Sequence, residues 1–291
     1  MKQFFLLFSV FFSLSFSAQQ DYEWFKINIY RSAVLNDSIN ENSGLDFFNN
    51  RLFTLNDSGN SSEIFEISKE TGKIENVFKT NLVNIDWEAI TSDSSNLYVG
   101  DFGNNLGTRK DLVVHKIPFT DSLMITKISQ HPFYYPEQVD FSPRNLNQNF
   151  DAEAMIFLNE KIHIFTKEWA AKSTTHYTID PTISTNQAAQ KIESYSTGYV
   201  VTDAAYYNQK LYLVGYTKNA EVYLAIFKES EPGIFFNEKP NKYYLGSSLN
   251  LGQIEGITVD AKGIYISGEQ FILPIVKAKP YLYFIPFEKM K

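Results

Sequence analysis

The chain has 291 residues, of which 44% are hydrophobic and 16% aromatic, and its formal net charge is −7. An acidic chain without a stripe of Lys and Arg is unsuited to nucleic acid, whose phosphates need clustered cations, and to anionic membrane surfaces. The absence of cysteine excludes disulfides and Cys-ligated metals. We therefore expect a folded domain that is stabilised by a large apolar core.

The first eighteen residues have the three parts of a secretory signal peptide. Lys2 precedes an apolar run over residues 4–16, and the small residues Ser17 and Ala18 follow. The run is too short to span a bilayer, which takes about 20 apolar residues. We expect a signal peptide over 1–18, export to the periplasm or the cell exterior, and a single mature domain over 19–291 without a membrane span.

Five copies of one pattern follow. Each joins an acidic or hydroxyl residue, an apolar strand, a polar turn and a second strand of alternating aliphatic and ring side chains. The copies read SGLDFFNNRLFTL from Ser43, EAITSDSSNLYVG from Glu88, EAMIFLNEKIHIF from Glu153, DAAYYNQKLYLV from Asp203 and EGITVDAKGIYIS from Glu255. A third strand follows every copy, and most continue into a fourth. The pattern predicts an all-β fold, a β-propeller of about five four-stranded blades.

Two segments depart from the repeat. The Pro- and Asn-rich residues 131–150 are expected to form an extended fourth strand and a loop over one face, and the alternative is a degenerate sixth blade. Residues 22–34 form a strand without a blade, while the last copy has room for only three strands. We expect the two ends of the chain to complete the last blade together, which hides the open edges of the sheet.

The segments DWEAITSDSSNLYVGDFGNN, VDFSPRNLNQNFDAEAMIFLNEKIHIFTKEW and IEGITVDAKGIYISGE carry a resemblance. They resemble an exported, functionally uncharacterised propeller family of Bacteroidetes-type bacteria. The blade starts are also similar to those of SdiA-regulated and esterase-like phytase propellers, and to the EG start of gluconolactonases and paraoxonases. In those lactonases a blade-start Glu binds a divalent metal. EA replaces EG in two blades here, and no counterpart of the whole ligand set is present.

The blade-start acids carry the candidate chemistry, because the inner strands of a propeller begin around one mouth of the channel. The predicted ring consists of Glu88, Glu153, Asp203 and Glu255, with Ser43 in the fifth place. Clustered carboxylates need a cation, shared protons or hydrogen-bond donors. An oxygen-only site favours Ca²⁺. The alternatives are that each acid pins neighbouring blades by accepting backbone N–H groups, or that the acids serve acid–base catalysis.

Loops between the second and third strands return to the same mouth. They add candidate ligand-binding residues, which are Asp57, Asp101, Lys167, Trp169 and Glu269. Trp169, Tyr216 and Phe271 fall in equivalent loops, where they either line a pocket for a sugar or another flat molecule or simply pack the loops. His115, His163 and His176 fall at packing positions of the repeat, whereas His131 lies in the insertion. The motifs of serine hydrolases, zincins and nucleotide-binding proteins are absent from the sequence.

The sequence leaves open whether the protein is an enzyme. We expect a monomeric binding or scaffold protein whose partner is a small molecule, a glycan or a protein, with a divalent cation at the channel mouth. The alternative is a metal-dependent hydrolase of lactones or esters, in which that cation polarises the scissile carbonyl.

Overall fold

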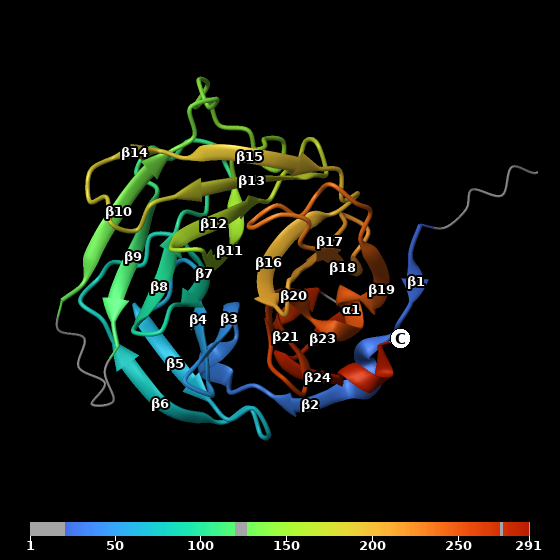
Figure 1. The fold of residues 1–291 in the computed structure, drawn as a ribbon. Helices are drawn as coiled ribbons and strands as arrows, with labels where there is room; N and C mark the ends of the chain where they lie inside the picture. The colour runs from blue at the N-terminus through green and yellow to red at the C-terminus, as the bar shows by residue number, and fades with distance from the viewer. Residues whose placement is uncertain (1–20, 120–126, 274–275, 291) are drawn as a thin grey trace, which may run out of the picture.

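The computed structural model describes residues 21–119, 127–273 and 276–290, so the expected signal peptide lies outside the described residues. Five sheets of mainly antiparallel strands are arranged as blades around a central axis (Figure 1). Their innermost strands lie next to one another in a closed ring, in which the inner strand of the last blade contacts that of the first. The predicted all-β, five-bladed propeller is confirmed.

Each blade has four strands in antiparallel order from the channel outwards. Blade 1 has β3 (Asn42–Phe48), β4 (Arg51–Asn56), β5 (Glu63–Ile67) and β6 (Ile74–Lys79). Blade 2 has β7 (Trp87–Ser92), β8 (Asn96–Asp101), β9 (Val113–Pro118) and β10 (Ser129–Tyr134). Blade 3 has β11 (Ala152–Leu158), β12 (Lys161–Thr166), β13 (Thr174–Ile179) and β15 (Gln190–Tyr195). Blade 4 has β16 (Val200–Tyr207), β17 (Lys210–Tyr216), β18 (Glu221–Lys228) and β19 (Asn241–Ser247).

The two ends of the chain complete blade 5. Its inner strands are β20 (Gln253–Val259), β21 (Gly263–Glu269) and β24 (Tyr281–Pro286), and the N-terminal β2 (Arg31–Val34) pairs with β24 as the outer strand. The preceding β1 (Glu23–Trp24) runs parallel to β19 on the outer edge of blade 4. Closure by the N-terminal segment was predicted, and the structure divides that segment between two blades.

Short elements connect or extend the blades. The 3-10 helices are η1 (Ile27–Tyr30), η2 (Asp37–Ile39) and η3 (Phe287–Lys289), and the one-turn α1 (Ser248–Leu251) joins blades 4 and 5. A hairpin of β22 (Phe271–Leu273) and β23 (Val276–Ala278) extends the connection between β21 and β24. β14 (Gln187–Ala188) adds to the edge of β10.

The insertion over residues 131–150 does not form a sixth blade. Its first residues complete β10, the outer strand of blade 2. The rest is a loop that packs on the β8–β9 connection, where Gln138 donates to the Gly107 carbonyl and Gln148 to the Asn104 carbonyl, both at 2.9 Å. The expected fourth strand is therefore present, and the rest of the insertion is a loop, as predicted.

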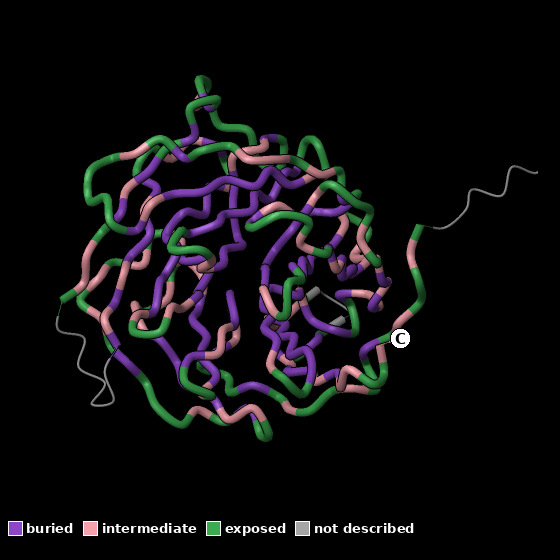
Figure 2. Tube along the Cα trace, viewed as in Figure 1, coloured by how far each residue is buried: buried purple, intermediate pink, exposed green. Residues whose placement is uncertain are grey.

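The apolar core lies between the blades. Each of the five buried clusters draws its side chains mainly from two neighbouring blades, as when Phe53 of blade 1 packs with Trp87 and Leu97 of blade 2. Figure 2 shows this burial along the inner strands and exposed turns around the rim. Positive φ angles at Asn49 and Asn50 form the tight turn between β3 and β4, a conformation that asparagine tolerates.

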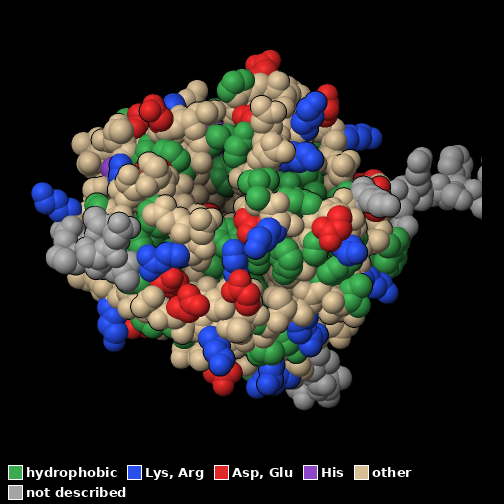
Figure 3. All heavy atoms as spheres, turned by 60° about the horizontal axis from the view of Figure 1, so that its bottom comes forward, with side chains coloured by type: hydrophobic (Ala, Val, Ile, Leu, Met, Phe, Trp, Pro, Cys, Tyr) green, Lys and Arg blue, Asp and Glu red, His purple; other side chains and the backbone are tan. Residues whose placement is uncertain are grey.

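The outer surface is mixed in charge. Figure 3 shows acidic and basic side chains interspersed over the face that is turned forward in that view. Among the described residues, no helix combines the length and hydropathy needed to cross a bilayer.

Candidate metal centre at the channel mouth

In three inner strands, the pairing skips an acidic residue near the start of the strand. The skipped residues are Glu88 in β7, Glu153 in β11 and Glu255 in β20. Such a β-bulge re-aims the side chain of the extra residue. All three carboxyls are buried, and burial is the main cause of the raised pKa values of Glu88 and Glu153. Like-charge repulsion adds to it: the charge of Glu153 raises the pKa of Glu88, and the charge of Glu255 raises that of Glu153. The three acids thus meet at one mouth.

The fourth predicted acid, Asp203, has a different environment. In blade 4 the pairing skips Thr202, which places Asp203 one position further along β16 and on the opposite side of that strand. Its carboxylate accepts the N–H of Ala204 at 2.8 Å and, from the neighbouring blade, the N–H of Ile257 at 2.7 Å. Asp203 therefore links blades 4 and 5, as the alternative interpretation of the blade-start acids expects.

Ser43, in the fifth place of the predicted ring, also links two blades. Its hydroxyl donates to the Glu88 carbonyl at 2.7 Å and lies 3.3 Å from Glu88 Oε2. The serine thus anchors the start of β7 and leaves the remaining oxygen of Glu88 available.

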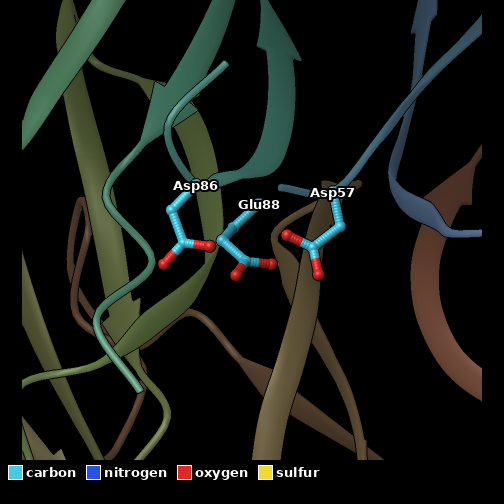
Figure 4. Close-up of side chains that lie close together, drawn as sticks. All are labelled: Asp57, Asp86 and Glu88. Atoms are coloured by element: carbon cyan, nitrogen blue, oxygen red, sulfur yellow. The ribbon is translucent and has the colours of Figure 1, made fainter. Parts of the chain in front are cut away.

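Three carboxyls in the described part of the chain lie close enough together to hold one metal ion. Asp57 follows β4, Asp86 precedes β7, and Glu88 lies within β7; one oxygen of each lies within 4.8 Å of the others. Figure 4 shows the three carboxylates side by side. Asp57 and Glu88 were candidate residues from the sequence, whereas Asp86 was missed. Its signal was the D-x-E spacing, since residues two apart on an extended chain point the same way.

The end of β8 holds Asp86 in place. The Asp101 carboxylate accepts the backbone N–H groups of Ile85 and Asp86 at 3.2 and 3.1 Å and pairs with Arg109 at 2.9 Å. Burial opposes the ionisation of Asp101, but hydrogen bonding to His115 and the charge of Arg109 outweigh it and lower its pKa. Asp101, a predicted ligand-binding residue, is thus engaged in positioning the cluster.

Gly103 leaves the space that the side chains of Asp86 and Glu88 occupy. A methyl carbon at this position would lie 2.5 Å from the carboxyl oxygens of Asp86 and Glu88. Only glycine leaves this approach open without displacing the two carboxyls.

Lys167 is the only buried lysine among the described residues, and it lies in the midst of the acids. Its ammonium group forms an ion pair with Glu153 Oε1. It lowers the pKa of every carboxyl around it, which are Asp57, Asp86, Glu88, Asp151, Glu153, Glu255 and Glu269. The net shift of each is nevertheless upward, because burial dominates. One lysine therefore leaves this mouth short of positive charge.

Two acids at this mouth, Asp57 after β4 and Glu269 at the end of β21, have pKa values far above their ordinary ones. Burial, followed by the charge of Glu255, raises the pKa of Asp57 to about 7 and that of Glu269 to about 10. Without a cation, the mouth must hold protons at neutral pH. A divalent ion would supply the same compensation and displace these protons.

An aromatic pocket adjoins the acids. Trp169 and Tyr216 are buried with ring centroids 6.3 Å apart, and the Lys167 ammonium lies 5.5 and 5.6 Å from their centroids. Tyr216 donates to Glu255 at 3.2 Å. These two rings, together with Tyr199, line a cavity of about 220 Å³. The indole N–H of Trp169 has no hydrogen-bond partner in the described part of the protein.

The histidines of blade 3 lie away from this mouth in a buried network. His163 Nδ1 is 2.7 Å from His176 Nε2, and His176 Nδ1 is 3.2 Å from Glu193. Burial and the neighbouring imidazole lower the pKa of His163 to about 3.

These features define a β-propeller with an acidic channel mouth. No family model matches the chain, and no curated protein matches it, so the family resemblance seen in the sequence remains a prediction.

Several solved structures show a distant similarity over most of this chain. Hydrazine synthase of Kuenenia stuttgartiensis is similar over 87% of this chain and 68% of its own, with 14% identity and a TM-score of 0.41. A "putative 6-phosphogluconolactonase" from Bacteroides uniformis is similar over 88% of this chain and 72% of its own, with 11% identity and a TM-score of 0.39. A chain of a mitotic checkpoint complex is similar over 81% of this chain and 60% of its own, with 11% identity and a TM-score of 0.37.

Proposed function

We propose that this protein is an exported binding protein that holds Ca²⁺ at its channel mouth through Asp57, Asp86 and Glu88. The observation that carries the proposal is the spacing of the three carboxylates, whose oxygens lie within 4.8 Å of one another. Two oxygens that each lie about 2.4 Å from one calcium ion are separated by at most about 4.8 Å. The three carboxylates are therefore spaced closely enough to bind one cation together.

The ligand chemistry favours calcium over a softer metal. The cluster offers only carboxylate oxygen, and the protein has no cysteine. Asp57 and Asp86 are partly exposed, which leaves coordination positions open toward the mouth. A ligand oxygen can complete the coordination there, while the cavity beside Trp169 and Tyr216 receives an apolar face of the ligand. The partner is thus a glycan, another small molecule or a protein segment, met in the periplasm or outside the cell.

The open coordination positions also support a second candidate, a metal-dependent hydrolase of lactones or esters. A substrate carbonyl bound to the cation would be polarised for attack. The buried Lys167 beside Glu153 would add positive charge near a developing oxyanion. The two candidates share the cation and differ in whether a bound ester is turned over.

Thermal unfolding with calcium and with EDTA tests the cation site. We expect calcium to raise the unfolding midpoint of the wild type, because a ligand that binds only the folded state stabilises it. Asp86→Asn should abolish that rise. Asp46→Asn is the matched control, since Asp46 is a partly buried acid of the inner strand β3 at the other end of the channel. Equal calcium responses in both variants would contradict the proposal.

Activity separates the two candidates. A panel of lactones and aryl esters, assayed with calcium and with EDTA, should show no chelator-sensitive turnover if the protein only binds its ligand. Turnover that EDTA abolishes and Asp86→Asn removes would instead support the hydrolase.

A further inference from the structure

A larger pocket lies at the junction of blades 4 and 5, away from the acidic cluster. It has a volume of about 590 Å³. We call it the seam pocket, and its lining includes Lys26, Arg31, Tyr244, Asn250, Lys277 and Tyr281. The N-terminal segment, β19, β24, α1 and the β22–β23 hairpin all contribute (Figure 1). The seam pocket therefore forms only when the two chain ends have closed the propeller.

The charge of the seam pocket is opposite to that of the protein. Lys26, Arg31 and Lys277 line it, and no acidic side chain does among the described residues, although the whole chain has a net charge of −7. Within the described ranges, none of these three cations has a carboxylate partner. Three uncompensated cations around one cavity favour an anion.

Arg31 is held in a fixed orientation. Its guanidinium carbon lies 3.8 Å from the centroid of the Tyr281 ring. The backbone of Arg31 is also fixed, because Arg31 pairs with Tyr283 in the β2–β24 ladder. Stacking occupies the face of the guanidinium group, and a side-chain hydrogen bond to Tyr283 engages part of its N–H edge. The guanidinium group has five N–H donors, so the remaining ones can still bind a ligand. Such an edge binds carboxylate or phosphate oxygens in a bidentate manner.

The size and the remaining lining indicate more than a bare anion. Pockets of about 300 to 1,000 Å³ take small organic ligands, whereas one phosphate would leave most of this volume empty. Tyr244 and Tyr281 provide ring surfaces, and Asn28 and Asn250 provide amide donors and acceptors. Aromatic rings beside amides suit the apolar faces and hydroxyls of a sugar ring.

We propose that the seam pocket binds an anionic sugar, in which the carboxylate or phosphate group meets Arg31 and Lys277. This site is separate from the cation site, so either proposal can fail without the other. Carboxylated and phosphorylated sugars share the required chemistry and are distinguished by the experiment.

Calorimetric titration of the full mature protein with glucuronate, glucose 6-phosphate and uncharged glucose tests the proposal. We expect at least one anionic sugar to bind with a Kd below about 1 mM, and glucose to bind at least about tenfold more weakly, because the anion supplies charge-assisted hydrogen bonds. Tighter binding of one anion identifies the acidic group.

Two variants locate the site. Lys277→Gln lies on the β22–β23 hairpin, outside the closing strands, and should weaken binding about tenfold through loss of one charged contact. Arg31→Gln should weaken it at least as much, with the fold checked by circular dichroism because Arg31 belongs to β2. Lys210→Gln, an exposed lysine at the start of β17, is the control. Absence of binding by both anions up to about 10 mM, or equal weakening by the Lys210 control, would overturn the proposal.

Discussion

Replacing Asp57 by asparagine tests whether the acidic mouth lowers stability when no cation is bound. The folded-state pKa of Asp57 is about 7 instead of the ordinary 3.8, because the group is buried near Glu255. The folded protein therefore keeps a proton that the unfolded chain releases. The contribution of this group to the free energy of unfolding falls as the pH rises from about 4 to about 7. At about 1.4 kcal/mol per pKa unit the whole loss is about 4 kcal/mol, an upper limit because Asp57 is partly exposed and water screens it.

About 2 to 3 kcal/mol of that loss falls between pH 5 and pH 8. The assay is urea unfolding in EDTA at both pH values, for the wild type, Asp57→Asn and the exposed-site control Asp37→Asn. His163 contributes a change of opposite sign below about pH 6.5, because its lowered pKa keeps it neutral in the folded state, and this change cancels between variants. Between pH 5 and pH 8, the free energy of unfolding should fall by up to about 2 to 3 kcal/mol less in Asp57→Asn than in the wild type and the control. An equal loss in all three proteins would refute the reasoning.

Three further substitutions separate the roles of neighbouring residues. Lys167→Met leaves Glu153 buried without its ion-pair partner, so urea unfolding in EDTA should show a loss of about 3 to 5 kcal/mol at pH 8 and a smaller loss at pH 5. Gly103→Ala places a methyl carbon against Asp86 and Glu88, and calorimetry should show at least about tenfold weaker calcium binding with little change in stability in EDTA. Asp203→Ala leaves two buried N–H groups unpaired and should cost about 2 to 4 kcal/mol, while calcium affinity stays within about twofold. A clearly weaker calcium affinity of Asp203→Ala would show that Asp203 contributes to the cation site.

The blade architecture was predictable because each blade has its own copy of one sequence repeat. The alternation of side chains marked each strand, and the five copies marked the blades. The short last copy and the unpaired strand before Ser43 indicated closure by the N-terminal segment. The further pairing of β1 with blade 4 has no repeat signal, since it rests on two residues at an outer edge.

The mouth was predictable only in part. Glu88, Glu153 and Glu255 follow the repeat, and the repeat shows which residues share a position. Asp203 begins its copy one residue closer to its second strand than the other acids do, and this offset reverses its side chain. Which carboxyls approach closely enough to share one cation depends on loop geometry. Hydrogen bonds of Asp101 fix that geometry by joining the end of β8 to the segment before β7.

The most direct test of the central claim is a crystal structure of the protein grown with calcium, with anomalous diffraction used to locate the ion. The account predicts one anomalous peak about 2.3 to 2.6 Å from carboxylate oxygens of Asp57, Asp86 and Glu88. A peak elsewhere, or none at these three carboxylates at millimolar calcium, would contradict it.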